Sequence, residues 1–118
     1  MHTQDAPDFL IVQVPSALHE QLAQRTEPWQ DTDKVAAELM VAGFDDFEQR
    51  VLYESPSRVI QEYTEALSRW ASPEVVGMTL PLTRSTTLRM RFSDKEYELG
   101  IPRFALMCMA HGLKLKRA

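Results

Sequence analysis

Two arginines spaced two residues apart are the side chains of this sequence best suited to recognising another molecule. Arg89 and Arg91 lie in residues 87–92 (TLRMRF), where polar and apolar residues alternate. Alternate side chains of a strand point to opposite faces, so we expect Thr87, Arg89 and Arg91 on one face. The planar guanidinium of arginine can bridge O6 and N7 of guanine. The pattern therefore predicts a strand that contacts DNA bases; the alternative is an exposed edge strand whose solvated arginines prevent aggregation.

A second alternating segment, residues 9–14 (FLIVQV), predicts another strand. Gln13 is the candidate base contact from this strand; the alternative is an ordinary exposed glutamine with no such role. The apolar Phe9 and Ile11 fall on the same face as Gln13. If they point outward, they predict a contact with a protein partner or a second copy of the chain; the alternative is that a helix covers them.

Four cationic residues near the ends of a C-terminal apolar helix are candidate contacts to DNA phosphates. Arg103 lies near the helix start, where free backbone N–H groups already favour an anion. The alternatives are an ordinary surface arginine at the start and a solubilising tail at the end. The candidates at the far end are Lys114, Lys116 and Arg117.

The charge is distributed unevenly along the chain. The formal net charge is −4, but residues 1–83 carry 14 acidic and 5 basic side chains, whereas residues 84–118 carry 3 acidic and 8 basic ones. This asymmetry predicts a basic surface formed by the C-terminal part. The alternative is that the acidic part pairs with the basic part.

Few residues suggest catalysis, a cofactor or a metal. The three histidines have no metal-ligand spacing, and Cys108, the single cysteine, lies in an apolar run and is expected to be a buried thiol. No phosphate-binding glycine loop, nucleophile motif or paired catalytic carboxylates are recognisable. We expect no enzymatic activity, no cofactor and no small-molecule substrate. No apolar run is long enough for a membrane span and no signal peptide is recognisable, which predicts a cytoplasmic protein.

The periodicity of apolar residues and the capping signals predict a mainly α-helical domain with one two-stranded antiparallel ribbon. An isolated strand pair needs helices over one face, and several helices are available. The expected elements are a disordered leader (1–8), a strand (9–14), helices at about 17–26 and from 31 or 32 to about 53, a helix at 57–71, an extended linker (73–85), a strand (86–92), a short helix that begins at Ser93 and is closed at Gly100, and a final helix (102–114).

The segments IVQVPSALHEQL (11–22) and LRMRFSDKEY (88–97) resemble the opening of ribbon–helix–helix proteins of the MetJ/Arc superfamily. The resemblance implies that residues 9–53 and 86–118 form two halves of a single-chain tandem pseudo-dimer, with residues 54–85 as an extra helix and linker. Its ribbon would pair 9–14 with 87–92. Single-chain versions of this fold are associated with plasmid DNA transfer.

The sequence thus predicts a double-stranded DNA-binding protein whose ribbon enters the major groove. Transcription regulation, plasmid maintenance and conjugation are the processes that the resemblance implies. The alternative is a protein–protein adaptor, similar to an antitoxin or a relaxosome accessory protein, that has this fold without reading DNA.

Overall fold

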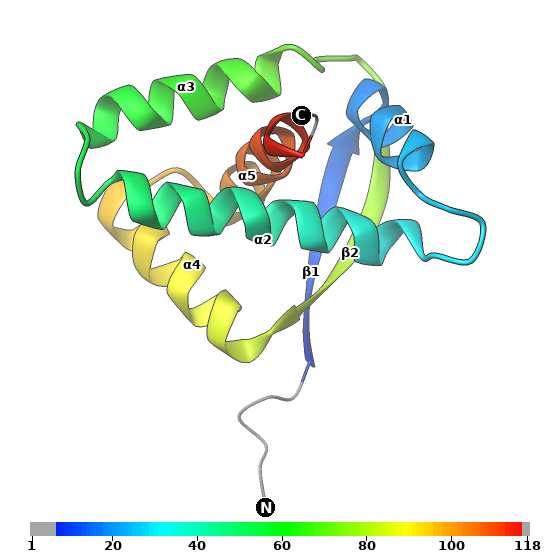
Figure 1. The fold of residues 1–118 in the computed structure, drawn as a ribbon, viewed down its shortest axis with the longest axis horizontal. Coiled ribbons are helices and arrows are strands. Elements are labelled where there is room, and N and C mark those ends of the chain that lie inside the picture. Colours follow the sequence, from blue (N-terminus) through cyan, green and yellow to red (C-terminus); the bar gives the residue numbers. More distant parts are fainter. Residues whose placement is uncertain (1–6, 117–118) are drawn as a thin grey trace, which may run out of the picture.

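The computed structural model describes residues 7–116, which form a bundle of helices over one face of a two-stranded sheet (Figure 1). This confirms the predicted mainly α class with an antiparallel ribbon. The elements in chain order are β1 (Pro7–Pro15), α1 (Ser16–Gln24), α2 (Thr32–Arg50), α3 (Pro56–Ser68), β2 (Val75–Thr83), α4 (Arg84–Tyr97) and α5 (Ile101–Leu115).

The ribbon pairs β1 with β2 in antiparallel register, from Pro7 opposite Thr83 to Pro15 opposite Val75. Each strand has nine residues, and the two central residues, Ile11 and Thr79, face one another. The predicted partner strand, 86–92, is wrong. The real partner, 75–83, lies where the sequence predicted an extended linker.

Residues 75–83 form a strand because β-branched and alternating apolar residues outweigh the turn-forming ones. Met78, Leu80 and Leu82 alternate into the core and are almost fully buried. Pro81 does not break the ladder, because the N–H of Thr79, two residues earlier, points away from β1 and donates to Asp33. The ring nitrogen of Pro81 lies on this same outer edge, where no ladder bond is lost.

Residues 84–97 form a helix because a strong helix start and good helix-forming residues outweigh the strand-like alternation of polar and apolar residues. The Thr83 hydroxyl accepts a hydrogen bond from the Thr86 N–H (3.1 Å), which caps α4. Thr86 and Met90, four residues apart, face the core. Arginine, leucine and methionine all have high helix propensity. The prediction that Thr87, Arg89 and Arg91 share one face of a strand is therefore wrong.

The central packing contact is the crossing of α2 and α5, and it is reciprocal. Gly43 and Gly112 are each the twelfth residue of their helix. A Cβ at Gly43 would lie 1.9 Å from the carbonyl oxygen of Cys108, and a Cβ at Gly112 would lie 1.9 Å from that of Leu39. Cys108 and Leu39 are each the eighth residue of their helix. The glycines thus let the two backbones touch.

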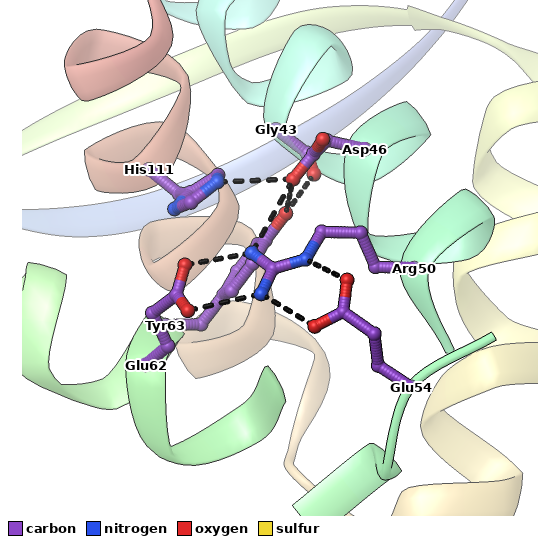
Figure 2. A network of polar contacts seen from close by, with 7 residues as sticks. All are labelled: Gly43, Asp46, Arg50, Glu54, Glu62, Tyr63 and His111. Atoms are coloured by element: carbon purple, nitrogen blue, oxygen red, sulfur yellow. Dashed lines mark hydrogen bonds and ion pairs between the residues drawn. The ribbon is translucent and has the colours of Figure 1, made fainter. Parts of the chain in front are cut away.

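The order strand, helix, helix occurs twice, as β1–α1–α2 and β2–α4–α5, with α3 between the two units. The helix α3 packs beside α5 and meets the C-terminal half of α2 (Figure 1). An ion pair joins α3 to α2: the Arg50 guanidinium of α2 donates hydrogen bonds of 2.6 and 2.9 Å to the Glu62 carboxylate of α3 (Figure 2). The same guanidinium also donates to Glu54.

Several predicted boundaries are close to the observed ones. The first two helices, the third helix and the last helix all occur where expected, and the strand predicted at 9–14 extends over Pro7–Pro15. Pro7 and Asp8 therefore belong to β1 and not to a disordered leader; residues 1–6 lie outside the described part. No helix in that part combines the length and apolar character that crossing a membrane requires.

Candidate functional site

The outer face of the ribbon is left uncovered by the described part of the chain. On β1, Phe9 is 62% exposed, Ile11 is 68% exposed, and Gln13 is also exposed. On β2, Gly77 and Thr79 are exposed opposite them. The inner face of the ribbon, by contrast, is sealed by the helices. The sequence correctly predicted that Phe9, Ile11 and Gln13 share a face.

This outer face carries hydrogen-bonding groups but no charge. Gln13 lies opposite Gly77, and a Cβ at Gly77 would be 3.7 Å from the Gln13 amide nitrogen. The Gln13 amide therefore lies beside Gly77, which has no side chain of its own to cover it. Together with the Thr79 hydroxyl, it provides the polar groups of the central part of this face.

One edge of the ribbon is bordered by the acidic first turn of α2. Asp31 caps this helix by accepting from the Asp33 N–H (3.0 Å), and the Asp33 carboxylate accepts from the Thr79 N–H of β2 (3.2 Å). Both carboxylates thus take up backbone donors that would otherwise be free to bind an anion. This edge is unsuited to a phosphate group.

The other edge is bordered by cations from the second unit. A small hollow beside β1 is lined by Phe9 of β1, Thr87 and Arg91 of α4 and Ile101 of α5, and also by the carboxylate residue Asp8. Arg103 follows in the first turn of α5, and both arginines are exposed. Neither forms an ion pair with another residue that the structure describes. The structure thus brings together Thr87, Arg91 and Phe9, although not through a shared strand.

The start of α5 is fixed by a carboxylate in α4. Asp94 accepts from the N–H groups of Leu99 (3.1 Å) and Gly100 (2.7 Å). Glu98 and Gly100 both have positive φ angles, 54° and 86°. This tight turn lets α5 reverse toward β1, and Arg103 lies in the first turn of that helix.

The remaining predicted DNA contacts lie elsewhere. Arg89 is held by Glu48 and lies 3.6 Å from Asp45, with its guanidinium carbon 5.2 Å from the centre of the Phe44 ring. It therefore joins α4 to α2. Lys114 and Lys116 are at the opposite end of α5 from Arg103. Arg117 lies outside the described residues.

A polar cluster between α2, α3 and α5 has residue types that could do acid–base chemistry (Figure 2). The Tyr63 hydroxyl lies 2.7 Å from the Gly43 carbonyl oxygen and 2.9 Å from Asp46 Oδ2, and His111 Nε2 lies 3.0 Å from the same Asp46 oxygen. The His111 ring stacks on Tyr63 at 4.0 Å. Burial lowers the pKa of His111. Because His111 is buried, this cluster joins helices rather than facing a substrate.

Sequence reasoning missed the β2 contribution to the ribbon, chiefly Thr79 and Gly77. The alternation of Met78, Leu80 and Leu82 was the available signal, but the neighbouring proline and glycine favoured a linker. Within the described part of the chain, no three His, Cys, Asp or Glu side chains come together as a metal site.

Comparisons of the chain with protein-family models, with curated proteins and with solved structures give no significant match.

Proposed function

We propose that the chain is a tandem ribbon–helix–helix pseudo-dimer that binds double-stranded DNA through the outer face of its β1–β2 ribbon. The observation that carries this proposal is the uncovered ribbon face with the exposed Arg91 beside β1 and Arg103 in the first turn of the adjoining helix α5. Support for the tandem arrangement comes from the repeated strand–helix–helix order and the central Ile11–Thr79 pair. It also comes from the reciprocal glycine contacts of α2 and α5.

A two-stranded ribbon fits the width of the major groove. In the proposed complex Gln13 reads adenine, Thr79 offers a hydroxyl, and Phe9 and Ile11 contact thymine methyl groups. An uncharged, partly apolar ribbon of this kind favours A·T base pairs over G·C pairs, because it lacks the arginine that guanine recognition usually uses.

Phosphate contacts come from one edge of the ribbon only. Arg91 lies beside β1 and Arg103 lies in the first turn of α5. The two guanidiniums supply the proposed contacts, because Pro102 has no N–H and Asp94 already accepts from the N–H groups of Leu99 and Gly100. Two such contacts predict a slope of roughly −2 for the logarithm of the binding constant against that of the salt concentration. One copy should therefore bind weakly, and useful affinity requires two copies on adjacent sites.

The direct test is fluorescence anisotropy with two 30-base-pair duplexes, one A·T-rich and one G·C-rich, at two salt concentrations. We expect salt-dependent binding that favours the A·T-rich duplex. The double variant Arg91→Ala/Arg103→Ala should weaken binding at least tenfold on both duplexes, because phosphate contacts carry no sequence information. Gln13→Ala should instead reduce the preference between them.

The matched control is Arg58→Ala, which removes an exposed arginine from α3. It should leave binding unchanged. If the double variant and this control bind equally well, the cationic edge does not contact DNA and the proposal fails. Transcription control and plasmid maintenance or transfer are the settings we propose for this activity.

The second candidate is a protein–protein adaptor that uses the same ribbon. Its specific support is the exposure of Phe9 and Ile11 together with the Asp31 and Asp33 carboxylates at one edge, which repel phosphate. This candidate predicts no affinity for either duplex even at low salt. The anisotropy experiment therefore distinguishes the two candidates.

A further inference from the structure

The helix α4 carries an apolar stripe that no described residue covers. Phe92 is 76% exposed and Leu88 is 55% exposed. They are four residues apart and so lie together on the helix surface. Met90, between them in sequence, is buried, so the stripe points away from the core. Exposed pairs of this size on a helix mark a contact surface.

A groove runs along one side of this stripe. It has a volume of about 660 Å³ and lies between α4 and the C-terminal part of α2. Its α2 wall includes Asp45, Glu48 and Leu52, and Leu52 is 74% exposed. Its α4 wall includes Glu96, which follows Phe92 by four residues. Arg89 of the same copy pairs with Asp45 and Glu48, so the rim has three carboxylates, with that of Glu96, against one guanidinium and remains acidic.

The opposite side of the same stripe is basic. Lys95 follows Phe92 by three residues and Leu88 by seven, and Arg84 precedes Leu88 by four. Both cations are exposed, and neither forms an ion pair with another residue among 7–116. The helix α4 thus has an apolar centre with a cationic border on one side and the acidic groove on the other.

We propose that this surface binds a second copy of the chain, with the two α4 helices packed in parallel about a two-fold axis. In a parallel pair related by such an axis, the left border of one helix faces the right border of the other. The cations of each copy then face the carboxylates of its partner. An antiparallel pair would instead place like charges together, which is unfavourable.

This dimer leaves the β2 edge of each ribbon accessible. Asp33, which contacts β2, and Glu48, which lines the groove, are 15 residues apart on α2, or roughly 22 Å along the helix. The groove and this edge of the ribbon therefore lie at opposite ends of α2, whereas Arg91 of α4 borders the other edge, beside β1. The dimer would present two ribbons together, which deepens the proposed DNA function but does not depend on it, because association is measured without DNA.

Sedimentation velocity over a range of protein concentrations tests the inference. We expect a concentration-dependent dimer, weak because the patch is small. Phe92→Ser should raise its dissociation constant at least tenfold. The matched control is Phe9→Ser, which removes an aromatic side chain of comparable exposure from the ribbon, and it should leave the dimer intact. A chain that stays monomeric throughout, or a dimer lost in Phe9→Ser but kept in Phe92→Ser, overturns the inference.

Charge reversal tests the orientation. Lys95→Glu alone and Asp45→Lys alone should each weaken self-association, because each places like charges across the axis twice. An equimolar mixture of the two variants should form a heterodimer at least as tight as the parent dimer, because both charge contacts become attractive. A mixture that associates no better than either variant alone overturns the parallel arrangement. Circular dichroism spectra equal to that of the parent show that the variants are folded.

Discussion

Replacing Gly112 with alanine tests the close crossing of α2 and α5 through the sign of its effect. In an ordinary helix interior, glycine to alanine stabilises the protein by about 1 kcal/mol. At this position the new Cβ would lie 1.9 Å from the carbonyl oxygen of Leu39 and 2.7 Å from its carbon. Both are backbone atoms and cannot rotate away, so the two helices must separate by roughly 1 Å.

The expected cost follows from this separation. A gap of about 1 Å forfeits roughly half of the dispersion energy of the atoms facing one another across the crossing. Overpacking of this kind costs about 3 kcal/mol at the upper end of its usual range. After the gain of about 1 kcal/mol in helix propensity, we expect a net loss of about 2 kcal/mol in the free energy of unfolding. For a chain of this length, the midpoint of thermal unfolding should fall by about 8 °C.

Urea denaturation followed by circular dichroism measures the effect. Gly43→Ala should cost a similar amount, because its Cβ would meet the Cys108 carbonyl at the same distance. The double variant should cost less than the sum, since the first substitution already opens the crossing. Gly77→Ala is the control: its nearest atom is 3.7 Å away, and we expect a change within about 0.5 kcal/mol. A Gly112→Ala protein more stable than the parent would refute the close packing.

Three further predictions concern the buried groups. Burial lowers the pKa of His111 in the folded protein, whereas the unfolded chain takes up that proton near the ordinary histidine pKa of about 6.5. The free energy of unfolding should therefore fall as the pH drops below about 6.5. Urea titrations between pH 7.5 and 5 should show that the free energy of unfolding depends less steeply on pH in His111→Gln than in the parent. Tyr63→Phe should cost about 1–2 kcal/mol by leaving its buried acceptors, including Asp46, without that donor, whereas Tyr53→Phe, at an exposed position, should be neutral in the same assay. Cys108 is fully buried with a raised pKa, so a thiol reagent should modify it only at the rate of unfolding, and rapid labelling in the native state would contradict this.

Much of the helical framework was predictable from the sequence because its signals are local. Ser55 and Pro56 indicate the start of α3, and the helix begins at Pro56. The second helix was expected to begin at residue 31 or 32, and Asp31 caps α2, which begins at Thr32. Such signals depend on a few neighbouring residues and hold in almost any tertiary context.

The position of the second strand was not predictable in the same way. Alternation over six residues fits a strand at 87–92 and at 77–82 alike. One deciding feature is tertiary: the Thr79 N–H points outward to Asp33, which makes Pro81 acceptable. The other is local: the Thr83 cap begins a helix at Arg84. The prediction placed Arg89 and Arg91 on the ribbon, whereas the structure has them on α4. Gln13 lies on β1, where the pattern placed it.

A tandem chain would also explain the unequal edges of the ribbon. In a true homodimer, both edges must carry the same residues, because one sequence supplies both halves. Here Asp31 and Asp33 of α2 correspond to Gly100 and Pro102 of α5, whereas the third residue of both helices is basic, Lys34 and Arg103. The central pair, Ile11 and Thr79, is also unlike. Covalent linkage of the halves would therefore allow one edge of the ribbon to carry two carboxylates that the other edge lacks. Under the proposed function, such a ribbon would bind DNA in a single orientation and select a site without two-fold symmetry.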